Sequence, residues 1–153
     1  MGTTRTIVVQ GEGLRSEALA NAILSPGHLV ELMSTGKVRK HATAGGHAET
    51  AFAVENDLKG DSVSDDYAAN DLAQYNVFQK GEQIMARIAD GEDIAIGDKL
   101  ESNGDGTLRK FVPVGDSGAG DGNSIVAVAM EACDMSGSSG ADPATNLCQV
   151  RIA

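Results

Sequence analysis

Residues 96–110 have the sequence IGDKLESNGDGTLRK and carry the clearest structural signal in the chain. A short apolar strand ends near Leu100, the turn residues Asn-Gly-Asp-Gly occupy positions 103–106, and an alternating segment returns from Thr107 to Val112. Tight β-turns require positive φ angles, which Gly, Asn and Asp tolerate better than other residues. The stretch therefore predicts a β-hairpin.

A second stretch, residues 26–40, repeats this pattern as PGHLVELMSTGKVRK. Gly27 aligns with Gly97, and the alignment continues without a gap to Lys40 and Lys110. After a Gly-rich segment, each copy is followed by an apolar strand that ends in Glu, at residues 51–55 and 125–131. We interpret the two regions, 26–55 and 96–131, as an internal repeat of a hairpin and a strand. Chance similarity of two hairpins is the alternative.

The composition favours an all-β protein. The chain has 153 residues, which fits one domain, and it contains 19 Gly, three Phe, two Tyr and no Trp. Turn clusters separate short segments with alternating apolar residues, and strands are expected at residues 72–78, 83–89 and 148–152. The predicted fold is a small barrel or sandwich of short antiparallel strands, formed by residues 26–153, with an extended N-terminal arm.

The arm comprises residues 1–25. Thr3–Gln10 has the β-rich composition of a strand, and Ser16 is placed to cap a short helix over residues 17–24. A strand that belongs to no hairpin often pairs with another chain. The alternative is an edge strand of the same domain.

Charge and cysteine content restrict the possible partners. The formal net charge of −10 argues against nucleic-acid binding and against attachment to an anionic membrane. The first residues lack the apolar core of a signal peptide, so synthesis in a cytoplasm-like compartment is expected. Cys133 and Cys148 could form a disulfide, but two unpaired thiols are the preferred interpretation for a reducing compartment.

No catalytic, cofactor or metal site is recognisable in the sequence. The segment Glu101–Gly106 superficially resembles a calcium loop, but Val112 stands where that loop requires a bidentate Glu. The acidic loop with Asp57, Asp61, Asp65 and Asp66 is more simply a solvated surface. The histidines at positions 28, 41 and 47 lack metal-ligand spacing. We therefore expect no enzymatic activity and no cofactor.

Several segments resemble the head decoration, or cement, proteins of tailed bacteriophages. The similar segments carry turn and strand signatures and cover most of residues 24–153; they are residues 25–30, 53–58, 65–69, 89–110, 128–132 and 150–152. The resemblance implies a β-rich virion protein made in the host bacterial cytoplasm. It also implies a position on the outer capsid surface, where such proteins bridge and stabilise major capsid protein subunits.

The family often assembles as homotrimers and sometimes as dimers, and its terminal arms frequently make the contacts. We therefore assign capsid or subunit contacts to the arm, at Thr3, Thr4, Arg5, Thr6, Ile7, Val8, Val9, Leu14 and Arg15.

An alternative function is a carbohydrate or host-surface binding module displayed on a virion, for which Tyr67, Tyr75 and Phe78 are the aromatic candidates. A trimeric nucleotide hydrolase is a further alternative, but its polar motif is not found.

Overall fold

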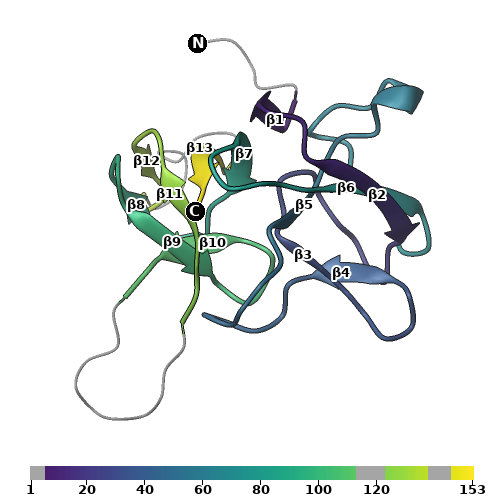
Figure 1. The fold of residues 1–153 in the computed structure, drawn as a ribbon, viewed down its shortest axis with the longest axis horizontal. Coiled ribbons are helices and arrows are strands. Elements are labelled where there is room, and N and C mark those ends of the chain that lie inside the picture. Colours follow the sequence, from purple (N-terminus) through teal and green to yellow (C-terminus); the bar gives the residue numbers. More distant parts are fainter. Residues whose placement is uncertain (1–5, 113–122, 138–145) are drawn as a thin grey trace.

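The structure is a computed structural model that describes residues 6–112, 123–137 and 146–153. The regular secondary structure of the described part is antiparallel β-strand apart from one 3-10 turn at Asp57–Lys59, which confirms the all-β prediction. The sheets form a sandwich-like arrangement rather than a closed barrel (Figure 1). A six-stranded sheet has the order β1-β7-β13-β11-β9-β10, and a three-stranded sheet has the order β2-β6-β5. The strands are β1 (Val8–Gln10), β2 (Leu14–Leu19), β3 (Val30–Leu32), β4 (Val38–Lys40), β5 (Ala51–Ala53), β6 (Leu72–Val77), β7 (Gln83–Arg87), β8 (Asp93–Ile94), β9 (Lys99–Ser102), β10 (Leu108–Lys110), β11 (Ile125–Ala129), β12 (Cys133–Asp134) and β13 (Leu147–Ile152).

The helix predicted over residues 17–24 is wrong. Residues 14–19 instead form β2, which pairs with β6 from Leu14↔Val77 to Leu19↔Leu72. The apolar face of the expected helix was weak, and a helix that short gains little stability without tertiary packing. Pairing with β6 therefore decides the local conformation. The strands predicted at 72–78, 83–89 and 148–152 are present as β6, β7 and β13.

The two stretches that align in the sequence form hairpins of identical register. Glu31 lies opposite Arg39 in the β3–β4 hairpin, and Glu101 lies opposite Arg109 in the β9–β10 hairpin. In each hairpin the arginine Nε donates to the glutamate Oε1 over 2.8 Å. The turns contain a glycine at equivalent positions, Gly36 and Gly106, with φ of 82° and 84°.

The correspondence extends beyond the hairpins to the strands on either side. The first repeat (residues 14–78) contains β2, β3, β4, β5 and β6, and the second repeat (residues 82–153) contains β7, β9, β10, β11 and β13 in the same order. Backbone hydrogen bonds at the strand ends also occur in equivalent pairs, one in each repeat. Ala20 N donates to Asp71 O and Ile88 N donates to Asn146 O, both over 2.8 Å. Likewise, Val54 N donates to Gln74 O over 3.0 Å and Met130 N to Gln149 O over 2.9 Å, while Gly27 N donates to Ala53 O over 2.8 Å and Gly97 N to Ala129 O over 2.9 Å. The described parts of the two repeats thus share one strand order and one set of backbone hydrogen bonds.

The two repeats pack as one body. The larger buried cluster combines Leu29 and Phe52 of the first repeat with Ile84, Leu100 and Val150 of the second. Backbone bonds also cross between the repeats, including Leu29 N to Gly106 O over 2.8 Å. Figure 1 shows β2–β6 on one side of the molecule and β8–β13 on the other. A shared core means that the arrangement of the two repeats is fixed by apolar burial.

Cys133 and Cys148 form a disulfide, so the preferred interpretation of two unpaired thiols is wrong. β12 carries Cys133 and β13 carries Cys148, both side chains are buried, and the Cα atoms lie 6.2 Å apart. The contact is made only after the chain leaves Asp134 and returns as β13. Sequence spacing alone does not contain that tertiary information.

Reducing this disulfide is expected to lower the free energy of unfolding by about 2–3 kcal/mol. The bond joins residues with a sequence separation of 15, and a crosslink of that size restricts the unfolded chain by roughly this amount. Urea unfolding with and without a phosphine reductant measures the difference. A Cys133→Ala/Cys148→Ala variant, the matched control, should not respond to the reductant. Equal stability of wild type in both conditions would contradict the prediction.

Candidate interaction surface

The predicted contact residues begin in a segment that the structure describes only from Thr6 onward. Thr3, Thr4 and Arg5 lie outside the described residues, whereas Thr6 is exposed. Ile7 is fully buried in the main core, and its backbone N–H donates to Glu55 Oε2 over 3.0 Å. The structure therefore removes Ile7 from the surface residues and makes it the point at which the N-terminal segment is anchored.

β1 follows this anchor and pairs antiparallel with β7, with Val8 opposite Ile84. The N-terminal strand is thus an edge strand of its own domain, which was the alternative to pairing with another chain. Val8 is half-buried and packs against the core, but Val9 has 47% of its surface exposed. Of the two valines, Val9 is the one available for contact.

Leu14 and Arg15 lie further along the chain, at the start of β2. Leu14 is 65% exposed, and Arg15 Nη2 donates to Asp57 Oδ1 over 2.8 Å. The hydrogen bond from Arg15 is the main reason that the pKa of the Asp57 carboxyl lies below its ordinary value. Both carboxyl and guanidinium remain exposed, so this ion pair leaves Arg15 accessible to a partner.

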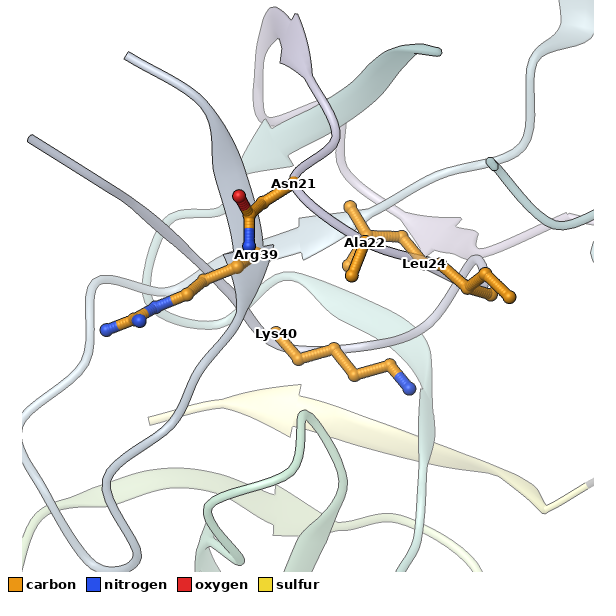
Figure 2. Close-up of a pocket in the computed structure, with 6 residues that line it drawn as sticks. Asn21, Ala22, Leu24, Arg39 and Lys40 are labelled. Atoms are coloured by element: carbon orange, nitrogen blue, oxygen red, sulfur yellow. The ribbon is translucent and has the colours of Figure 1, made fainter. Parts of the chain in front are cut away.

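A groove of about 440 Å³ adjoins the end of β2 (Figure 2). Residues 21–24 form one wall and β4 forms the other; the lining side chains are Asn21, Ala22, Ile23, Leu24, Arg39 and Lys40. Figure 2 shows Arg39 and Lys40 running in opposite directions from β4, with Ala22 and Leu24 on the facing segment. Such a groove offers apolar contact flanked by two positive charges. The sequence did not reveal it, because residues 17–24 were predicted to be helical.

Several side chains that could serve as metal ligands have partners within the protein. Glu131, Cys133 and Cys148 lie close enough to hold a metal ion, but both sulfurs are used in the disulfide. Asp105, in the stretch resembling a calcium loop, accepts hydrogen bonds from the backbone N and Oγ1 of Thr107. Asp65 accepts similarly from Ser62. These carboxylates therefore stabilise local turns.

The aromatic candidates for a carbohydrate platform do not form one. Tyr67 and Phe78 are buried, and the Tyr67 hydroxyl donates to Val54 O over 2.6 Å. Tyr75 packs against the smaller core cluster. An exposed aromatic ring is what a sugar face requires for stacking, and these rings are used for packing instead.

In the described ranges, no helix is long and apolar enough to span a membrane.

Comparison with known proteins gives a result at the level of fold. No protein-family model matches the chain, and no curated protein matches it. Among solved structures, the chain is similar to the N base of head fiber gp8.5 of bacteriophage phi29, with a TM-score of 0.58 and 16% sequence identity. The match covers 93% of this chain and 95% of that chain. The chain therefore shares its overall fold with a component of a bacteriophage head fiber.

Proposed function

We propose that this protein is a virion structural protein that decorates and stabilises the outer surface of a bacteriophage capsid by bridging neighbouring major capsid protein subunits. The observation that carries the proposal is the fold shared with the phi29 head fiber base over nearly the whole of both chains. The resemblance of the sequence to head decoration proteins supports the same role. The proposed role is structural rather than enzymatic.

The architecture suits a protein that bridges subunits. The two repeats share one core, and a buried disulfide crosslinks the second of them, so the body can transmit force between separate contacts. Linked weak contacts gain affinity because binding at one site raises the effective concentration at the next. The contact residues that we propose, for the capsid or for a second subunit, are Thr3, Thr4, Arg5, Thr6, Val9, Leu14 and Arg15; Ile7 and Val8 are left out because they pack in or against the core.

The proposal is tested by co-sedimentation of purified protein with empty capsid shells. The shells should be assembled from the major capsid protein encoded in the same genome, in unexpanded and in expanded, undecorated form. We expect saturable binding to expanded shells and greater resistance of those shells to heat. Failure to bind expanded shells at micromolar concentrations would overturn the proposal.

Removing proposed contact groups from the N-terminal segment should weaken shell binding without unfolding the protein. We expect a variant that lacks residues 2–5 and carries Val9→Ser to bind expanded shells at least about tenfold more weakly, because several linked contacts are lost together. Deletion must stop before Ile7, since this side chain is fully buried.

The matched control is Leu32→Ser/Ile96→Ser, which removes exposed apolar side chains outside the N-terminal segment, 60% and 72% accessible respectively. It should bind like wild type. Both variants should unfold at the wild-type temperature. Unchanged shell affinity of the N-terminal variant would contradict the assignment of these contacts.

A further inference from the structure

The two repeats differ in what covers one strand edge. β2 of the first repeat corresponds to β7 of the second, as their equivalent pairing with β6 and β13 shows. The outer edge of β7 is covered: Met85 N donates to Ile7 O over 2.8 Å, and Arg87 N donates to Gly27 O over 3.0 Å. Apart from a bridge between Ala20 and Val38 of β4 just beyond its C-terminal end, the corresponding edge of β2 has no strand beside it within the described residues, because the sheet order is β2-β6-β5.

The hydrogen-bond pattern identifies which groups of β2 point outward. Ala20 N donates to Asp71 O, which lies in register with the pairing of β2 and β6. Because partners alternate along an antiparallel pair, the even-numbered residues of β2 bond to β6. The backbone N–H and C=O groups of Arg15, Glu17 and Leu19 therefore face away from the sheet. Glu17 and Leu19 correspond to Met85 and Arg87, whose N–H groups are both used.

We propose that the outer edge of β2 pairs with β2 of a second copy of this chain, antiparallel and across a twofold axis at Ser16. In an antiparallel pair, residues directly opposite each other point to the same face of the sheet. A twofold axis at Ser16 satisfies this condition and brings outward-facing residues into hydrogen-bonded pairs. Arg15 of one copy then lies opposite Glu17 of the other, and the same pair occurs again on the far side of the axis.

A second copy fits this edge because its charge sequence is self-complementary. Opposite charges placed directly across a strand pair are stabilising, and this register places two such pairs around one axis. Arg15 can serve both Asp57 and a partner glutamate, since a guanidinium has several N–H donors. The paired sheets would be continuous, in the order β5-β6-β2-β2-β6-β5.

The surroundings of β2 also lack the usual protection of an edge strand. Exposed strand edges are commonly blocked by Pro, by Lys or by a β-bulge. Residues 14–19 contain neither Pro nor Lys, and their pairing with β6 has no register shift and therefore no bulge. Leu14 and Leu19 are 65% and 45% exposed at the two ends of the strand. Leu58, 82% exposed, lines a shallow depression with Arg15 and Glu17. This apolar surface would be partly covered in the dimer.

The test is sedimentation equilibrium of the full chain, free of capsid shells, over a wide concentration range. Wild type is expected to reach twice the chain mass of 15.7 kDa. Arg15→Glu and Glu17→Arg each place like charges opposite each other twice, so each should weaken the dimer about tenfold or more. The combination Arg15→Glu/Glu17→Arg exchanges the two charges and should restore dimerisation.

Arg39→Glu is the matched control. Arg39 is as exposed as Arg15, 45% against 46%, and is likewise held in an ion pair, but it lies on β4 away from the proposed interface, so this variant should dimerise like wild type. Glu17→Pro provides an independent test: it removes an outward N–H that the sheet does not use, and should leave a folded monomer. Three results would each overturn the proposal. The wild type could stay monomeric, it could form a trimer that Glu17→Pro does not affect, or the charge-exchanged variant Arg15→Glu/Glu17→Arg could fail to recover dimerisation. The result does not depend on binding to a capsid.

Discussion

Replacing Arg109 with Met is expected to lower the free energy of unfolding by about 3–4 kcal/mol, whereas Arg39→Met lowers it by less than about 1 kcal/mol. The two arginines occupy equivalent positions of the two hairpins and make the same 2.8 Å bond to a glutamate. Their partners differ in burial. The Glu101 side chain is 1% exposed and that of Glu31 is 26% exposed.

The difference follows from desolvation. Without Arg109, the buried carboxylate of Glu101 loses its counter-charge, and its Oε2 already has no hydrogen-bond partner among the described residues. Removing one partner of a buried ion pair is costly because the remaining charge cannot be solvated. Glu31 can be solvated by water after Arg39→Met. Urea unfolding at neutral pH measures both values, and similar losses in the two variants would contradict the account.

Acidification from pH 7 to pH 4 is expected to destabilise wild type by about 3 kcal/mol more than it destabilises the His28→Asn variant. Burial is the main reason that the pKa of His28 falls from 6.5 to about 4, and the positive charges of Lys40 and Arg87 lower it further. The carboxylates of Asp105 and Asp66 act in the opposite direction. Ser25 N–H donates to His28 Nδ1 over 3.1 Å, so protonation of this nitrogen also breaks a hydrogen bond.

The sign of the effect follows from the two pKa values. Between pH 6.5 and about 4 the unfolded chain binds a proton at His28 that the folded chain does not bind, so folding becomes less favourable as the pH falls. Below about pH 4 both states are protonated and this contribution is constant.

Asn is a suitable replacement because the second repeat uses Asp98 at the equivalent position, where Oδ2 accepts from Ala95 N over 2.9 Å. Urea unfolding of both proteins across this pH range measures the difference. An identical acid-induced loss in the two proteins would show that His28 is not responsible.

Local turn chemistry made much of the fold predictable from sequence. Glycine at positions 36 and 106 and the alternating residues around them specify the two hairpins, and the short range of these interactions keeps them visible in the sequence. β6, β7 and β13 were predicted for the same reason. The full repeat was not, because β2 and β7 resemble each other in hydrogen bonding rather than in side chains.

The features that the sequence did not predict depend on tertiary contacts. Residues 17–24 carry a weak helical pattern, but pairing with β6 makes the first of them part of β2. The disulfide requires β12 and β13 to meet, and the burial of Ile7 requires the whole core. The groove beside Lys40 likewise exists only because residues 21–24 leave the sheet next to β4. Propensity and spacing describe neighbours along the chain, whereas these contacts join distant segments.

The role that we propose for this protein is to bind the outside of a capsid between major capsid protein subunits. Electron cryomicroscopy of expanded, undecorated shells incubated with the purified protein is the sharpest test of this role. We expect additional density on the outer surface that fits the two-repeat body and contacts at least two neighbouring capsid subunits. Shells that gain no outer density at saturating protein, or density that contacts a single subunit, would contradict it.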